Sequence, residues 1–110
     1  MNLTTEATTG FAIIRVSGRL TASSAPALRA EVQEVVAGGV ARIVVDLGGT
    51  TFVDSSGLGT LIGALKTTRV AGGDLRIAAV PDTVRTVLRL TSLDRVLRAH
   101  DRAETAFQDE

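Results

Sequence analysis

The chain has 110 residues, 45% of them hydrophobic, a length and composition typical of one folded domain with a single core. Its twelve Lys and Arg balance twelve Asp and Glu, so the formal net charge is zero and gives no electrostatic case for direct nucleic-acid or membrane-surface binding. Cysteine is absent, which excludes disulfides, thiolate catalysis and cysteine metal sites.

The N-terminal residues 1–10 are polar and rich in threonine, without the apolar segment of a signal peptide. No apolar run approaches the ~20 residues that a membrane span needs. We therefore expect residues 1–110 to form a single soluble domain in the cytoplasm.

The first part of the chain predicts a β-hairpin. Residues 3–8 alternate weakly, as an edge strand does, and residues 11–16 form a stronger strand pattern. Only Thr9 and Gly10 separate the two runs, which is short enough for a hairpin turn.

A helix is expected next. The segment from Thr21 to Ser24 is typical of a helix start, Pro26 is tolerated in a first turn, and Gly38 with Gly39 marks the end. Helical spacing places a set of apolar residues on one face: Leu28, Val32, Val35 and Val36.

Residues 42–66 are the most informative stretch. The apolar run 43–45 predicts a strand covered on both faces, residues 48–51 read as a turn, and Phe52 with Val53 returns to the core. Asp54 and the serines after it are helix-capping residue types. A helical repeat of apolar residues follows: Leu58, Leu61, Ile62 and Leu65.

Two glycines, Gly59 and Gly63, lie four residues apart inside this predicted helix. Each costs about 1 kcal/mol relative to alanine, so their presence indicates a helix face that something approaches closely. The two explanations are tight packing of the helix on the sheet and contact with a partner.

The remaining pattern continues the alternation of strands and helices. We expect a strand over residues 74–80, a helix from Pro81 and Asp82, a turn at 92–94, a strand over 95–99 and a helix over 101–108. The inward residues of the third helix are Val84, Val87 and Leu88. The order β-β-α-β-α-β-α-β-α predicts an α/β fold, with a mixed, mostly parallel sheet, an N-terminal antiparallel hairpin and about four helices.

The start of the second helix is chemically distinctive. First-turn amides have no intrahelical acceptor, and the helix dipole adds partial positive charge, so an anion is favoured there. Ser55 is held on a rigid element near solvent, and phosphorylation adds a charge of about −1.5 to −2 that meets this dipole. Asp54 opposes that charge, and the alternative is that Asp54 and Ser55 only cap the helix.

Residues 52–59, Phe-Val-Asp-Ser-Ser-Gly-Leu-Gly, resemble the signature of the STAS family, in particular its small bacterial anti-sigma factor antagonists. Residues 18–21, Gly-Arg-Leu-Thr, and residues 72–75, Gly-Gly-Asp-Leu, match two further family segments, so the resemblance covers nearly the whole chain. It implies the STAS fold and a non-catalytic regulator without cofactor or metal.

The resemblance also implies a partner switch. The unmodified protein binds an anti-sigma factor that is also a serine kinase, phosphorylation of Ser55 ends that binding, and a phosphatase restores it. The implied partner-binding residues are Asp54, Ser55, Ser56, Gly57, Leu58 and Thr21. Thr21 is a departure, because antagonists often carry Asp there. Its hydroxyl is still able to cap the first helix.

Other chemistries lack their residues. The chain has neither a Gly-x-Ser-x-Gly elbow nor a Walker loop, and its one histidine, His100, is expected at the surface. One histidine and scattered carboxylates lack metal-ligand spacing, and three Phe without Trp or Tyr offer no platform for stacking bases. The chain therefore lacks the parts to perform phosphoryl transfer, but it offers a hydroxyl that is able to receive a phosphoryl group.

Two rival interpretations remain open from the sequence. One is a non-switching STAS scaffold or a binding subunit of a stress or transport complex, with Ser55 only a cap. The other is a helix start that binds a nucleotide or another anionic small molecule. The sequence does not determine the oligomeric state.

Overall fold

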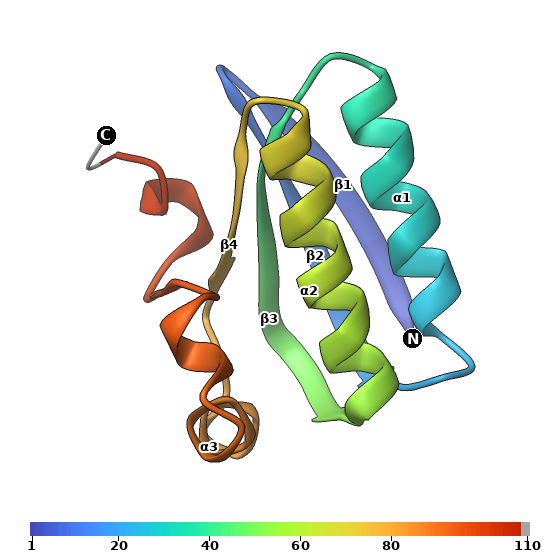
Figure 1. The fold of residues 1–110 in the computed structure, drawn as a ribbon, viewed down its shortest axis with the longest axis vertical. Helices are drawn as coiled ribbons and strands as arrows, with labels where there is room; N and C mark the ends of the chain where they lie inside the picture. The colour runs from blue at the N-terminus through green and yellow to red at the C-terminus, as the bar shows by residue number, and fades with distance from the viewer. Residues whose placement is uncertain (109–110) are drawn as a thin grey trace.

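A single sheet with strand order β1-β2-β3-β4-β5 organises residues 1–108, the part of the chain that the computed structural model describes (Figure 1). Strand β1 pairs antiparallel with β2, and the other neighbours pair in parallel. The predicted mixed α/β sheet with an N-terminal hairpin is therefore confirmed. The strands are β1 (Asn2–Thr8), β2 (Phe11–Leu20), β3 (Arg42–Val53), β4 (Asp74–Ala78) and β5 (Ala99–His100).

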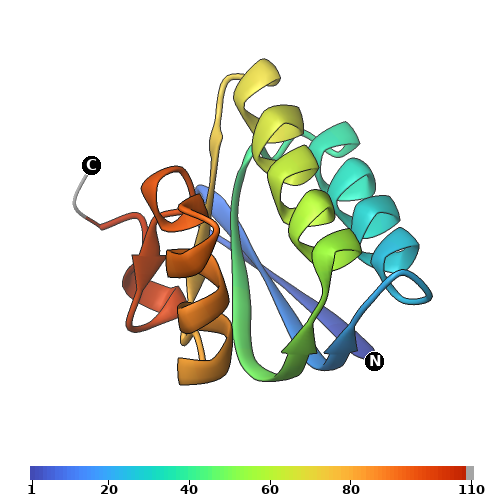
Figure 2. The same ribbon diagram turned by 60° about the horizontal axis from the view of Figure 1, so that its bottom comes forward.

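Three α-helices connect the parallel strands and pack on the same face of the sheet (Figures 1 and 2). Their bounds are α1 (Ala25–Ala37), α2 (Ser55–Val70) and α3 (Asp82–Leu90). The main core lies between this face and the helices. Its largest fully buried members are Ile14, Leu20, Leu28, Ile43, Leu47, Leu61, Leu75, Ile77, Leu88 and Leu97.

The opposite face of the sheet is partly covered by the C-terminal segment, which contains the 3₁₀ turn η2 (Ala103–Thr105). Phe107 packs there over the apolar cluster that includes Ile13 and Val44. Arg76 is buried beneath it, 3% exposed, with its guanidinium 4.3 Å from the centre of the Phe107 ring and one nitrogen donating to the Ala106 carbonyl at 2.6 Å. The segment is thus held by apolar packing and by a buried arginine.

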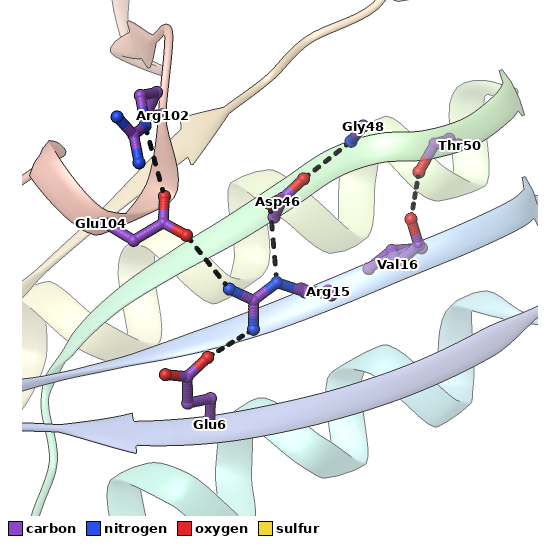
Figure 3. Close-up of polar contacts among 8 residues, drawn as sticks. All are labelled: Glu6, Arg15, Val16, Asp46, Gly48, Thr50, Arg102 and Glu104. Atoms are coloured by element: carbon purple, nitrogen blue, oxygen red, sulfur yellow. Dashed lines mark hydrogen bonds and ion pairs between the residues drawn. The ribbon is translucent and has the colours of Figure 1, made fainter.

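An arginine on the same face links the hairpin to this segment (Figure 3). The Arg15 guanidinium lies 2.6 Å from Glu6 of β1, 3.8 Å from Asp46 of β3 and 3.4 Å from Glu104 of η2. The hydrogen bond with Glu6 raises the pKa of Arg15, with burial acting in the opposite direction. Since these side chains are partly exposed, the cluster contributes orientation more than free energy.

The predicted turn at residues 48–51 is wrong, because β3 continues through it to Val53. The glycines serve close strand packing instead: a Cβ on Gly49 would lie 2.9 Å from that of Ser17 on β2, where the register of the two strands shifts. Phe52 does not return to the core either. It is 47% exposed, because alternation along the strand turns Val53 inward and Phe52 outward.

The C-terminal predictions also need correction. The fourth α-helix expected over 101–108 is only the turn η2, and the strand expected over 95–99 is only β5, preceded by the 3₁₀ turn η1 (Leu93–Arg95). The segment must lie across a sheet face with Ala103 and Ala106 both inward, and their three-residue spacing suits a 3₁₀ turn. Strand β4 stops at Ala78 because Ala79 has a positive φ of 54°.

Candidate functional site

The two segments that the sequence singled out lie together at the carboxyl ends of β2 and β3 (Figures 1 and 2). Strand β2 leads into the loop of residues 21–24 and then α1, while β3 leads through Asp54 into α2. Because these strands are parallel neighbours, both connections leave the same edge of the sheet. The Asp54 amide extends the pairing by donating to the Leu20 carbonyl at 3.2 Å.

Asp54 caps α2, as its residue type predicts. Its backbone is extended (φ −98°, ψ −174°), and its Oδ1 accepts a hydrogen bond from the Gly57 amide at 2.9 Å. Its Oδ2 accepts a second bond, at 3.3 Å, from the Ala22 amide in the neighbouring loop. One carboxylate thus joins the start of α2 to the loop that precedes α1.

Gly57 lets the first turn of α2 sit directly on the end of β2. A Cβ at this position would lie 2.5 Å from the Leu20 carbonyl oxygen and 3.0 Å from a methyl group of Val53. The contact is with backbone, so no side-chain rotation relieves it. A glycine is therefore required here to bring the helix start against both strands.

Ser55 and Ser56 are the first two residues of α2, and both are exposed. Their amides belong to the first turn, where backbone N–H groups have no intrahelical acceptor. An anion on either hydroxyl would stand in the favourable field of the helix dipole. The geometry therefore gives an external enzyme access to a hydroxyl on a rigid element.

The loop of residues 21–24 is held by its own hydrogen bonds. The Ser24 hydroxyl donates to the Arg19 carbonyl at 2.7 Å and accepts from the Thr21 amide at 2.9 Å, while the Thr21 carbonyl accepts from the Ser24 amide at 3.0 Å. The Thr21 hydroxyl lies 3.2 Å from that of Ser23. Thr21 therefore does not cap α1, which begins after Ser24 because the turn occupies this segment.

The predicted partner-binding residues form one patch, but they differ in exposure. The hydroxyl-bearing Ser55 and Ser56 are exposed, whereas Gly57 and Leu58 are buried beneath them. Asp54 and Thr21 are half-buried, and they lie on either side of the joint, the hydrogen bond from the Ala22 amide to Asp54 that links the loop to α2. Gly57 and Leu58 thus shape the patch from below rather than at its surface.

Gly59 and Gly63 are not packed on the sheet. A Cβ on either glycine would meet nothing within 4 Å, so the explanation by tight packing is wrong. Both glycines line a pocket of about 190 Å³ between α1 and α2, together with Arg29, Val32, Gln33, Thr60, Ala64 and Thr67. Contact with a partner remains a prediction for this face.

Sequence reasoning missed the Ala22 amide, the second donor to Asp54. Its side chain is a methyl group and carries no chemical signal, since the interaction uses the backbone. It also missed Arg19, whose guanidinium lies 5.1 Å from the centre of the exposed Phe52 ring where β2 and β3 end. His100, expected at the surface, is half-buried, and its Nε2 is covered.

Two further properties concern the described residues as a whole. Within residues 1–108, no three His, Cys, Asp or Glu side chains gather closely enough to hold a metal ion. None of the helices in this range has the length and apolar character needed to cross a membrane.

Comparison with known proteins places these features in a family. Residues 2–106 match the STAS domain. The anti-sigma F factor antagonist of Paenibacillus polymyxa is 29% identical over 101 residues, 91% of this chain and 86% of that protein. The anti-sigma-B factor antagonist of Staphylococcus aureus (strain NCTC 8325 / PS 47) is 29% identical over 106 residues, 94% of this chain and 98% of that protein.

Solved structures show the same fold. An anti-sigma factor antagonist from Mycobacterium paratuberculosis superposes with a TM-score of 0.86 at 26% identity, covering 98% of this chain and 92% of that one. The anti-sigma factor antagonist SpoIIAA in its unphosphorylated form superposes with a TM-score of 0.76 at 23% identity, covering 98% of this chain and 96% of that one. The Bacillus cell fate determinant SpoIIAA in its phosphorylated form superposes with a TM-score of 0.75 at 22% identity, covering 99% of this chain and 100% of that one.

Proposed function

The chain belongs to the STAS domain family, and from this premise we propose that it is an anti-sigma factor antagonist switched by phosphorylation of Ser55. Unmodified, it binds an anti-sigma factor that is also a serine kinase, and the sigma factor is released in the cytoplasm. Phosphorylation ends the binding, and a phosphatase restores it. The observation that carries the proposal is the exposed Ser55 hydroxyl at the first position of α2, next to the capping Asp54.

In this proposal the chain is a substrate and not an enzyme. The kinase supplies ATP, Mg²⁺ and the base that accepts the hydroxyl proton. A bond forms between Ser55 Oγ and the γ-phosphorus, the bond from that phosphorus to ADP breaks, and ADP leaves. The role of this chain is to hold the Ser55 hydroxyl at a fixed position on the helix.

Electrostatics explain why the modification would act on binding more than on folding. In the free protein, the dipole of α2 and the surrounding water accommodate the phosphate. In the complex, the phosphate would have to lose water beside the Asp54 carboxylate, at the centre of the contact. Removing water from these two like charges without a counter-ion costs several kcal/mol on binding, so binding is lost while the fold remains.

Thr21 belongs to the same surface in this proposal. Its hydroxyl lies beside that of Ser23, at the loop that Asp54 joins to α2. Where antagonists often present a carboxylate, this chain presents two neutral hydroxyl groups. We therefore expect Thr21→Asp to change the rate of phosphorylation or dephosphorylation without changing the fold.

The test is to incubate the protein with its anti-sigma factor kinase and Mg-ATP and to locate phosphate by mass spectrometry. Ser55→Ala should abolish the label, and Ser56→Ala is the matched control that should keep it. Ser55→Asp should weaken binding to the anti-sigma factor by at least about tenfold.

Two results would contradict the proposal. An unlabelled protein that still binds the anti-sigma factor would favour the non-switching scaffold. Full affinity of both Ser55→Asp and the phosphorylated protein would exclude charge at Ser55 as the control.

A further inference from the structure

The Asp54 carboxylate connects two parts of the proposed binding surface that are separate in sequence. Its Oδ1 binds the Gly57 amide at 2.9 Å and its Oδ2 binds the Ala22 amide at 3.3 Å. We infer that Asp54 is a positioning residue that holds the loop of residues 21–24 against α2, and that a phosphate on Ser55 releases this loop. The inference rests on the proposed function, because it takes Ser55 as the modified residue.

The loop divides into a fixed base and an exposed tip. The base is held by the Ser24 hydroxyl, which bonds the Arg19 carbonyl and the Thr21 amide. The tip consists of Ala22 and Ser23, both exposed, and the Ala22 amide ties it to the start of α2 through its bond to Asp54. Loss of that bond therefore frees the tip and leaves the base in place.

A phosphate on Ser55 acts directly on this bond. It is attached one residue after Asp54 and carries about −1.5 to −2 charge with three acceptor oxygens. It repels the carboxylate and competes with it for the first-turn amides, including the Gly57 amide that Asp54 caps. The contact with Ala22 is the longer of the two, so a small shift of the carboxylate breaks it first.

The consequence is a switch with two components. Phosphorylation would add charge at the start of α2 and would also move the Ser23 hydroxyl at the loop tip away from that of Thr21 in the base. A partner that contacts both segments then loses shape complementarity as well as electrostatic complementarity. The effect remains local because the sheet and the helices are untouched.

The experiment uses the full chain, labelled with ¹⁵N, with phosphoserine inserted at position 55 during translation. Amide hydrogen exchange is measured by NMR with and without the phosphate. We expect the Ala22 amide to exchange about fivefold faster in the phosphorylated protein, as loss of one exposed hydrogen bond predicts. The Ser24 amide, bonded within the loop base to the Thr21 carbonyl, is the internal control and should not change.

Two variants test the joint from its two sides. Asp54→Asn keeps a carbonyl oxygen for the Gly57 amide but offers an NH₂ group to Ala22, so Ala22 should exchange rapidly without phosphate and show no further response to it. Ala22→Pro removes the donor at the second position of a turn, where proline is well tolerated. In that variant the Ser23 resonance should have the same position with and without the phosphate.

An Ala22 exchange rate that phosphoserine leaves unchanged would overturn the inference. So would a phosphate response that persists in Asp54→Asn. Because the phosphate is inserted without a kinase, either result leaves the proposed function intact. Failure of the proposed function would instead appear in the kinase labelling described above.

Discussion

The glycines of α2 allow one prediction in which the same substitution has opposite effects at neighbouring positions. An added methyl group at Gly57 would lie 2.5 Å from the Leu20 carbonyl oxygen and 2.9 Å from Leu20 Cγ, whereas at Gly59 and Gly63 it would meet nothing within 4 Å. All three residues lie in the same helix. Alanine is therefore expected to stabilise the protein at two positions and to destabilise it at the third.

The magnitudes follow from two terms. Replacing an open helical glycine by alanine gains about 1 kcal/mol, so Gly59→Ala and Gly63→Ala should each raise the free energy of unfolding by that amount. At Gly57 the clash is with backbone, and overpacking of this kind costs up to about 3 kcal/mol. Subtracting the propensity gain leaves a loss of about 2 kcal/mol for Gly57→Ala.

Urea unfolding followed by far-UV circular dichroism measures these differences, provided that the variants share one m-value. The expected separation between Gly57→Ala and Gly59→Ala is about 3 kcal/mol, well beyond the error of such curves. A Gly57→Ala protein at least as stable as the parent would refute the close approach of α2 to β2. A clear loss of stability in Gly59→Ala would show that the face is packed after all.

Three further predictions concern other parts of the fold. Ala79→Gly should raise the free energy of unfolding by about 0.5 kcal/mol in urea titrations, because alanine is strained at its φ of 54°; a loss would contradict this. Phe107→Ala should lower the free energy of unfolding by about 3 kcal/mol, since it uncovers Arg76 and the sheet face. Unchanged stability would show that the C-terminal segment does not stabilise this face of the sheet. Arg15→Gln should lower the free energy of unfolding by less than about 1 kcal/mol in 0.1 M salt, and by less still in 1 M salt, which screens the ion pairs. The hydrogen bond with Glu6 raises the pKa of Arg15, so the guanidinium keeps its charge and its stabilising effect at every pH below strongly alkaline conditions. The loss of stability in Arg15→Gln should therefore be constant between about pH 6 and 10, and a pH-dependent loss would contradict the ion pairs as its cause.

The stability variants also bear on the glycine face. If Gly59→Ala and Gly63→Ala fold better than the parent, the two glycines do not serve the fold. Their remaining explanation is the one that the sequence offered beside packing, namely contact with a partner. Weaker binding of the anti-sigma factor by these stabilised variants would support it, and unchanged binding would remove it.

The parts of the site that could be predicted from the sequence are those that local chemistry determines. Asp54 caps α2 because a short carboxylate before a helical repeat finds the free amides three residues ahead. The turn expected at residues 48–51 was wrong for the opposite reason. Gly48 and Gly49 read as turn residues, but the close approach of Ala79 to Gly48 and of Ser17 to Gly49 decides their role, and no local pattern predicts these contacts.

The C-terminal segment shows the same limit. Its composition favours a helix, yet the apolar surface of the sheet determines its path and leaves only the turn η2. The burial of Arg76 within a strand is likewise not predictable from local sequence. A charged residue is buried only where partners such as the Phe107 ring and the Ala106 carbonyl compensate for lost water. These two partners are about thirty residues away in sequence and cannot be recognised from the strand, unlike Asp74 of the same strand, which lies 3.5 Å from the Arg76 Nε.

The joint between Asp54 and Ala22 lies between these two cases. Parallel pairing of β2 and β3 is predictable from the order of the elements, and it already requires the loops after the two strands to meet at one edge. The particular donor is not predictable, because every residue other than proline offers the same N–H group. The joint therefore depends on a side chain at position 54 only, and any residue except proline at position 22 preserves it. Substitutions of the tip residues Ala22 and Ser23 that keep the Ala22 amide should leave the proposed switch intact, whereas the loss of one oxygen from Asp54 should uncouple the loop tip from Ser55.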